Sequence, residues 1–165
     1  MIDPTTLGRL FDAAAPGLVL YARQWLDPQE AQDVVQEAFI KLMQQRPQPD
    51  DAKAWLCRTV RNEAIDRLRS AQRRQKRELA VTQERAPWFD PRPDDLVDAA
   101  SAQAALATLP QEQRDVVVLR IWNGLTLVQI ATVIGCPVST VFSRYQSALT
   151  AIRRRLEEPC QTSKD

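Results

Sequence analysis

The fold is decided by the stretch Thr126-Leu-Val-Gln-Ile-Ala-Thr-Val-Ile-Gly-Cys-Pro-Val-Ser-Thr-Val141. Thr126 can cap a short helix, and Gly135 can adopt the positive φ angle of a tight turn. Ala131 is small where two helices must approach closely, and Val141 can insert between them from the second helix. The spacing therefore predicts a helix-turn-helix.

The second helix of this motif is expected to begin near Ser139 or Thr140. At 100° per residue, its inward apolar stripe consists of Val141, Tyr145, Ala148, Leu149, Ile152 and Leu156. Its other face is polar and includes Thr150 and Arg154. Because Ser, Thr and Gln can bond to base edges and Arg to phosphates, the DNA-binding candidates are Ser139, Thr140, Ser143, Arg144, Gln146 and Ser147. The alternative interpretation is an ordinary solvated helix of a helical bundle.

Further helices precede this motif in the second half of the chain. A helical pattern runs from Asp98 to Ala107. Pro110 opens the next helix, and Asn123 with Gly124 supplies its stop. The apolar residues of that helix include Val116, Val117, Leu119 and Ile121.

The first half also has a helical pattern, in three amphipathic stretches. The first precedes Asp27 and Pro28, which are a plausible cap and first-turn proline for the second. The third follows a loop at residues 46–51 and is rich in arginine. The three apolar stripes are Leu7, Leu10, Phe11, Ala14, Leu18, Tyr21, Ala22 and Trp25; Ala31, Val34, Val35, Ala38, Phe39 and Leu42; and Trp55, Leu56, Val60, Ala64, Ile65 and Leu68.

A proline- and aspartate-rich segment, residues 76–100, is expected to be a flexible linker. Fully extended, it would span roughly 85 Å. The expected fold class is therefore all-α, with two small helical domains, residues 5–75 and 101–157, that could engage sites well apart. Trp88 and Phe89 should not be left in water, so we expect them to pack on a domain or on a partner.

The composition favours a globular helical protein with two different partners. Of the 165 residues, 44% are hydrophobic and 26% charged, and only four are glycine. The formal net charge is +1, but the charges are unevenly distributed. Between Asp27 and Glu37 there are four acidic residues and no basic one, whereas Arg58 to Glu78 holds eight basic and three acidic residues. An acidic face and a basic stretch suggest separate partners.

Several protein classes have little support in the sequence. Cys57, Cys136 and Cys160 are far apart and there is no histidine, so we expect reduced thiols, no metal site and no cofactor. Residues 1–10 lack an apolar export segment, and no apolar run approaches the length of a membrane span, so the expected location is cytoplasmic, without membrane insertion. No glycine-rich phosphate loop or evident carboxylate pair indicates an enzyme, and no catalytic residue is predicted.

Three stretches carry a family resemblance. They are Glu30-Ala-Gln-Asp-Val-Val-Gln-Glu-Ala-Phe39, Ala54-Trp-Leu-Cys-Arg-Thr-Val-Arg-Asn-Glu-Ala-Ile-Asp-Arg-Leu68 and Leu109-Pro-Gln-Glu-Gln-Arg-Asp-Val-Val-Val-Leu-Arg120, the last followed by Gly124-Leu-Thr126 and Val138-Ser-Thr-Val141. Together they resemble the extracytoplasmic-function group of the sigma-70 family of RNA polymerase sigma factors. The resemblance covers nearly the whole chain and implies a promoter-melting region 2 in residues 5–75 and a region 4 in residues 101–157.

The first stretch resembles the part of region 2 that docks on the clamp of the polymerase β′ subunit. Asp33, Gln36 and Glu37 lie on the polar side of a helix whose other face is buried, so they form an acidic and amide patch available to a basic partner. A plain solvated face is the alternative. We take these three residues as polymerase-binding candidates.

The second stretch is similar to the helix that reads and opens the minus-ten promoter element. The DNA-binding candidates here are Arg58, Arg61, Asn62 and Arg69, and Arg67, Arg73 and Arg74 extend the basic surface. The resemblance implies that Asn62 contacts an extruded base, for which residues 45–53 could form a wall. Without the resemblance, Asn62 would be interpreted only as a helix-surface residue.

The chain departs from the family pattern at several positions. Gln32 stands where the family usually has Glu, which thins the acidic patch. Phe142 and Ser147 stand at positions that are often basic, and Gln129 replaces a common acid. We therefore expect an atypical minus-thirty-five sequence and a recognition helix that binds free DNA weakly.

The leading hypothesis is a sigma factor that binds core RNA polymerase and directs promoter-specific transcription initiation without chemistry of its own. The resemblance implies core RNA polymerase, through its β′ clamp and β flap, and promoter DNA as partners. A membrane anti-sigma factor is common for such proteins, although no residue demonstrates one. The alternative is a stand-alone helix-turn-helix regulator that does not bind polymerase.

Overall fold

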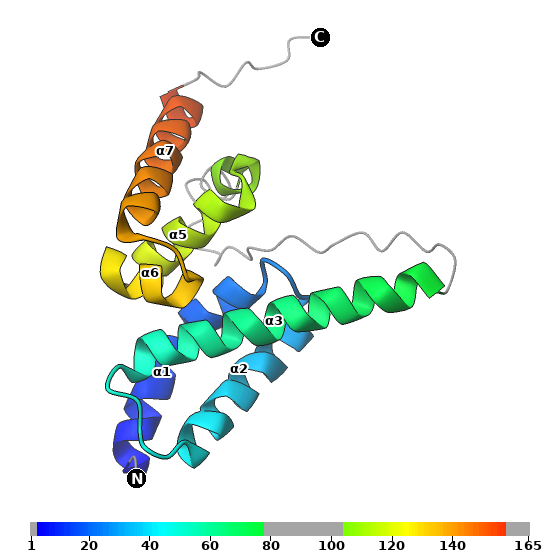
Figure 1. Cartoon of the computed structure of the whole chain (residues 1–165), viewed down its shortest axis with the longest axis vertical. Coiled ribbons are helices and arrows are strands. Elements are labelled where there is room, and N and C mark those ends of the chain that lie inside the picture. Colours follow the sequence, from blue (N-terminus) through cyan, green and yellow to red (C-terminus); the bar gives the residue numbers. More distant parts are fainter. Residues whose placement is uncertain (1–2, 78–103, 158–165) are drawn as a thin grey trace, which may run out of the picture.

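The computed structural model describes residues 3–77 and 104–157, and every regular element within these two stretches is helical (Figure 1). The first stretch contains α1 (Pro4–Ala22), α2 (Pro28–Gln44) and α3 (Ala52–Arg77). The second contains a short helical segment, residues 104–108, followed by α5 (Gln111–Ile121), α6 (Leu127–Ile134) and α7 (Val138–Glu157). The all-helical prediction is confirmed. Trp88 and Phe89 lie outside the described residues.

The helices α1, α2 and α3 pack around one apolar core. The side-chain carboxylates of Asp3 and Asp27 accept hydrogen bonds from first-turn backbone N–H groups, which confirms the predicted cap at Asp27. The fully buried side chains of this core include Leu18, Tyr21, Val34, Leu42, Leu56 and Val60. Phe11 was expected to face inward; its side chain is exposed at the edge of the bundle, although its ring still contacts that of Phe39 at 4.9 Å between centroids.

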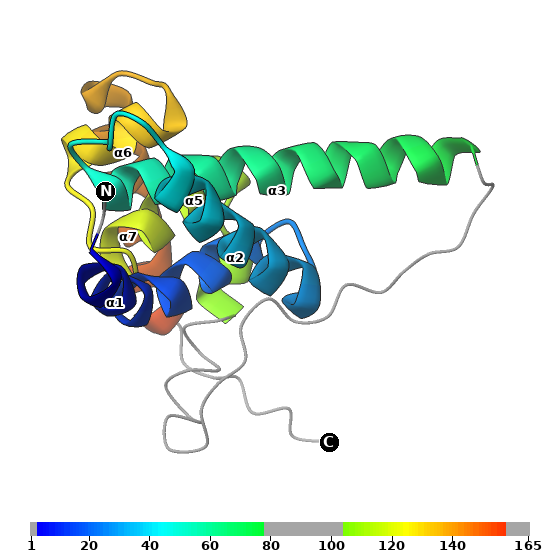
Figure 2. The same ribbon diagram turned by 90° about the horizontal axis from the view of Figure 1, so that it is seen from below.

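The long helix α3 extends beyond this bundle (Figures 1 and 2). Residues 71–77 are all exposed, and three of the last four are basic: Arg74, Lys76 and Arg77. Cations near a helix C-terminus interact favourably with the helix dipole. The end of α3 is therefore a projecting basic rod that no described helix covers.

The predicted helix-turn-helix is confirmed in α6 and α7. Thr126 and Gln129 form a capping box: the Gln129 backbone N–H donates to Thr126 Oγ1 at 3.2 Å, and the Thr126 N–H donates to Gln129 Oε1 at 2.7 Å. Gly135 ends α6 with φ of 78°, a value that favours glycine. Val141 is fully buried and packs in the apolar core, as its expected insertion between the helices requires.

One part of the predicted inward stripe of α7 is wrong. Leu156 is 57% exposed, whereas Tyr145, Ala148 and Ile152 pack with Leu106, Leu109 and Val117. The apolar cover from residues 104–119 ends near Ile152, so the last turn of α7 has no apolar partner among residues 3–77 and 104–157. Periodicity predicted the right face of the helix but not the point at which the domain ends.

The two halves of the chain lie in direct contact. The helix α5 lies against α1, and α6 lies against α3 (Figures 1 and 2). A single apolar cluster contains Leu18 and Val60 from the first half together with Leu119, Ile130 and Val141 from the second. The sequence predicts two domains on a tether and does not indicate this shared core.

No single helix among residues 3–77 and 104–157 has both the length and the hydropathy of a membrane span. Within these two stretches, α6 and α7 reach those limits when taken together, and the pair is bent by 107°.

Candidate nucleic-acid interface

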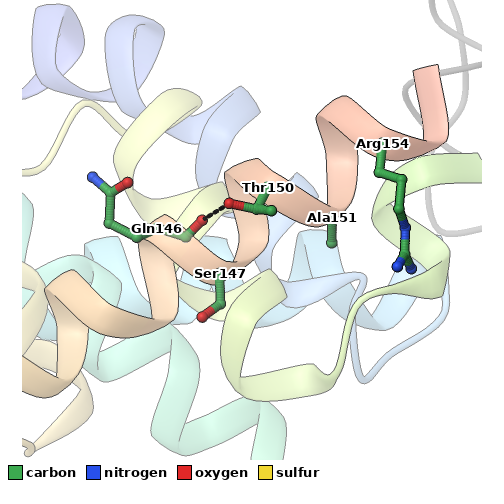
Figure 3. A pocket seen from close by; sticks show the side chains of 5 residues that line it. All are labelled: Gln146, Ser147, Thr150, Ala151 and Arg154. Atoms are coloured by element: carbon green, nitrogen blue, oxygen red, sulfur yellow. Dashed lines mark hydrogen bonds between the residues drawn. The ribbon is translucent and has the colours of Figure 1, made fainter. Parts of the chain in front are cut away.

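The outer face of α7 carries most of the DNA-binding candidates of the second half. Ser139, Ser143, Gln146 and Ser147 are exposed, whereas Thr140 is half-buried. Farther along the same face, Thr150 Oγ1 donates to the backbone carbonyl of Gln146 at 3.0 Å. The face is slightly hollowed into a pocket of about 390 Å³, lined by Gln146, Ser147, Thr150, Ala151 and Arg154 (Figure 3). Hydroxyl and amide groups dominate this surface, as base-edge hydrogen bonding requires.

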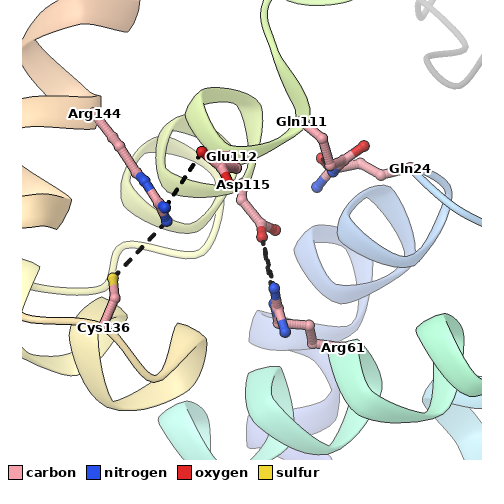
Figure 4. A network of polar contacts seen from close by, with 7 residues as sticks. All are labelled: Gln24, Arg61, Gln111, Glu112, Asp115, Cys136 and Arg144. Carbon is pink, nitrogen blue, oxygen red and sulfur yellow. Dashed lines mark hydrogen bonds and ion pairs between the residues drawn. The ribbon is translucent and has the colours of Figure 1, made fainter.

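Arg144 differs from the other candidates on α7 because its charge is already paired. Its guanidinium lies 3.3 Å from a carboxylate oxygen of Glu112 on α5 and 4.0 Å from Sγ of Cys136 in the turn (Figure 4). Only a quarter of the Arg144 side chain is exposed. In this arrangement Arg144 braces the recognition helix against α5, and a contact with a phosphate would have to compete with Glu112.

The candidates on α3 fall into two groups. Arg58, Asn62 and Arg69 are exposed, and Arg69 makes a long surface pair with Asp66 at 4.0 Å. The Arg61 side chain is 22% exposed and points to the second half of the chain, where Nη2 lies 3.2 Å from Oδ2 of Asp115 (Figure 4). The helix thus offers three side chains to solvent and uses the fourth to hold the two halves together.

Asp115 is the centre of that contact and could not be recognised from the sequence. Its side chain is 3% exposed, and burial raises the pKa of its carboxyl, although Arg61 acts in the opposite direction. Burial, and then the negative charge of Asp115, raises the pKa of Tyr21 well above its usual value. The only sequence signal was a carboxylate directly before the apolar run Val116–Leu119, which does not reveal its partner.

All buried polar side chains in the described part of the chain lie at the contact between the halves. They are Gln24, Asp115 and Asn123. Gln111 donates to Gln24 at 2.9 Å, whereas Asn123 lies against Gly17. The contact is incompletely satisfied, because Tyr21 Oη, Gln24 Nε2 and Asp115 Oδ1 are buried without a hydrogen-bond partner among the described residues.

The acidic and amide patch on α2 lies as expected on its polar side. Gln36 is exposed, and Asp33 and Glu37 are half-buried. Glu37 Oε1 accepts a 2.7 Å hydrogen bond from Arg67 on α3, and this bond raises the pKa of Arg67. The patch therefore has a carboxylate held in a fixed position by the neighbouring helix.

A second ion pair continues this network across α2 and α3. Lys41 Nζ lies 2.8 Å from Glu63 Oε2, and that hydrogen bond lowers the pKa of Glu63. Next to the network, a pocket of about 330 Å³ is lined by Glu30, Glu63, Asp66, Arg67, Ser70 and Arg74.

An apolar extension of the patch was also missed. Ile40 and Met43 are exposed on α2; Ile40 lies one turn beyond Gln36, and Met43 lies one turn beyond Ile40. The sequence did contain a signal for this exposure, because its apolar periodicity assigned neither residue to the core. Polar and apolar side chains together give α2 the mixed character of a protein-binding surface.

Comparison with known proteins identifies both halves of the chain. The family model described as Sigma-70 region 2 matches residues 10–74, and that described as Sigma-70, region 4 matches residues 99–152. The chain is 34% identical over 157 residues to the ECF RNA polymerase sigma factor SigL of Mycobacterium tuberculosis, with 90% of this chain and 88% of SigL covered.

Two further comparisons extend this result. The ECF RNA polymerase sigma factor SigE of Mycolicibacterium smegmatis is 33% identical over 130 residues; the match covers 75% of this chain but only about half, 51%, of SigE. Among solved structures, the sigma factor RpoE of Bartonella quintana, crystallised with the anti-sigma factor NepR, aligns with a TM-score of 0.73 at 23% identity, covering 92% of this chain and 97% of that one. At that identity the structural likeness concerns the fold.

Proposed function

The chain belongs to the extracytoplasmic-function group of the sigma-70 family of RNA polymerase sigma factors, and we propose that its two regions divide promoter recognition between them. It is a sigma factor that directs transcription initiation with RNA polymerase, and this family is not enzymatic. In our proposal, region 2, residues 5–75, binds core polymerase and melts the minus-ten element. Region 4, residues 101–157, reads the minus-thirty-five element.

The observation that carries this proposal is the pair of opposite surfaces on adjacent helices of region 2. The helix α2 presents Asp33, Gln36 and Glu37, whereas α3 presents Arg58 and Arg69 and continues into a basic rod. An acidic surface suits a basic protein partner, and a row of arginines suits the DNA backbone. One small domain can therefore hold polymerase and promoter at the same time.

The docking surface on α2 is preorganised. Arg67 holds Glu37 at 2.7 Å, so less side-chain entropy is lost when a partner binds. Ile40 and Met43 add exposed apolar area beside the charges. We assign this surface to the β′ clamp of core polymerase, and a surface of region 4 to the β flap.

Arg61 can contact promoter DNA only by exchanging partners. In the described conformation Arg61 is held by Asp115. If Arg61 contacts DNA together with Arg58, Asn62 and Arg69, the two regions must separate first. The incompletely satisfied contact between them is consistent with such a separation.

We also propose an anti-sigma partner and a cytoplasmic location for this protein. RpoE of Bartonella quintana was crystallised with the anti-sigma factor NepR, and its fold covers 92% of this chain. A sigma factor binds core polymerase and promoter DNA, which a bacterium keeps in its cytoplasm.

The decisive test is transcription by core polymerase supplemented with this protein. We expect transcripts from specific promoters in a genome-wide run-off assay. A stoichiometric mixture that initiates at no promoter would refute the proposal.

A pull-down with core polymerase tests the docking surface separately. The double variant Asp33→Lys/Glu37→Lys should lose retention by at least about tenfold, because charge reversal opposes a basic partner. Asp12→Lys/Glu157→Lys, which makes the same change of charge at two exposed sites outside that surface, should be retained like the wild type. Unchanged retention of the Asp33 and Glu37 variant, with the thermal melt showing it folded, would favour a stand-alone DNA-binding regulator.

A further inference from the structure

The first turns of the recognition helix expose two apolar side chains. Val138 is 41% exposed and Phe142 is 51% exposed, although Val141 between them is fully buried. Residues four positions apart lie on the same side of a helix. Val138 and Phe142 therefore form a small apolar strip at the start of α7.

Polar DNA-binding candidates lie directly beside this strip. Ser139 is three residues before Phe142 and Gln146 is four residues after it, and both are exposed. Ser143 is also exposed and adjacent in sequence. A surface that approaches the DNA through these three side chains brings the Phe142 ring to the same base edges.

Charge contributes little to binding by this part of the helix. Between residues 138 and 149 the single charged side chain is Arg144, which pairs with Glu112 at 3.3 Å. Discrimination between base pairs must therefore come from hydrogen bonds and from apolar contact.

Thymine alone among the four bases presents a methyl group in the major groove, and apolar side chains recognise that group. We infer that Phe142, supported by Val138, contacts a thymine 5-methyl group in the element that region 4 binds and makes that position of the promoter a thymine. This inference rests on the proposed function of region 4. It assigns a specificity role to a position where the family often has a basic residue.

The test removes only the methyl group. Core polymerase with this protein transcribes a library of promoters with a randomised minus-thirty-five element, and the best promoter is rebuilt with each thymine of that element replaced in turn by deoxyuridine. At one position the replacement should lower open-complex formation by about fourfold, which corresponds to the loss of one buried methyl contact. With Phe142→Ala, thymine and deoxyuridine should be equivalent at that position, whereas Phe142→Leu should keep part of the difference.

Leu156→Ala is the matched control. Leu156 is an exposed apolar residue on the same helix, roughly 21 Å farther along its axis, and its variant should keep the fourfold effect. The inference is overturned if no deoxyuridine replacement affects the wild type, or if Phe142→Ala responds to the methyl group as the wild type does. It is also overturned if Phe142→Ala lowers transcription equally on all templates, since that result indicates a protein contact.

The same experiment separates the inference from the function on which it rests. Wild-type protein that yields no transcript from any library member refutes the proposed function and the inference together. Transcription that is promoter-specific but insensitive to the methyl group refutes the inference alone.

Discussion

The contact between α6 and α7 is apolar, whereas the contact between the two halves of the chain adds buried polar and charged groups to a shared apolar cluster. The buried side chains of α6 and α7 are all apolar: Ile130, Val133, Val141 and Ala148. The contact between the halves contains Asp115 paired with Arg61, together with Gln24 and Asn123. A buried ion pair recovers little more than its desolvation cost, whereas apolar packing is a net gain. The helix-turn-helix should therefore be a fixed unit, and the contact between the halves should be the more separable of the two.

The largest loss of stability should come from a substitution in the apolar contact between α6 and α7. Ile130→Ala should lower the free energy of unfolding of region 4 by about 2–5 kcal/mol, because Ile130 is fully buried and its removal leaves a cavity. Urea unfolding with hydrogen exchange of the α6 and α7 amides measures this loss. Val128→Ala on the exposed side of the same helix should change stability by less than about 0.5 kcal/mol. Equal losses for the two variants would contradict the fixed-unit interpretation.

A smaller net effect is expected at the ion pair. Arg61→Ala leaves Asp115 buried without its paired cation, at a cost of about 3–5 kcal/mol in the closed form, and the molecule can limit this cost by opening, which hydrates the carboxylate. Solution X-ray scattering should show a larger radius of gyration, while the melting of each region changes little. Arg58→Ala, which removes the same charge from the exposed side of α3, should stay compact. An Arg61→Ala protein as compact as the wild type would show that the ion pair does not control the contact.

The smallest effect should be a dependence of the contact on pH. Burial raises the pKa of Asp115 in the closed conformation, so protonation of Asp115 favours closure. This stabilisation of the closed conformation is complete below the ordinary pKa of an aspartate, and it is lost as the pH rises through the raised pKa. Arg61, Tyr21 and Arg144 act on the same carboxyl, and the cations oppose the shift. Scattering across a pH series should show the wild type becoming more compact in mild acid, with Asp115→Asn losing this response. The same pH response in both proteins would assign it to other carboxylates.

Much of the fold is encoded locally and could therefore be predicted from sequence. Thr126 and Gly135 act on their own few residues, so the start and the end of α6 follow from short-range chemistry. The polar face of α2 and the exposed face of α7 follow from periodicity alone. The polar face of α2 and the exposed face of α7 contain most of the candidate binding residues, so the positions of these residues could be predicted.

The features that could not be predicted depend on distant parts of the chain. Arg61 and Asp115 are 54 positions apart, and nothing near either residue indicates the other. Arg144 was expected to contact phosphate, but its guanidinium forms an ion pair with Glu112 on another helix. Periodicity shows which side of a helix is apolar, but it does not show what will cover that side.

One close approach between the halves makes this contact open to protein engineering. A Cβ atom at Gly17 would lie 2.9 Å from the backbone oxygen of Trp122 and 2.9 Å from Oδ1 of Asn123. Within a helix, alanine is ordinarily preferred to glycine by about 0.5–1 kcal/mol. Gly17→Ala would therefore stabilise α1 while pushing Trp122 and Asn123, which directly follow α5, away from it. A single methyl group could thus weaken the contact between the halves, and the time that the two regions spend together would become an adjustable property of the sequence.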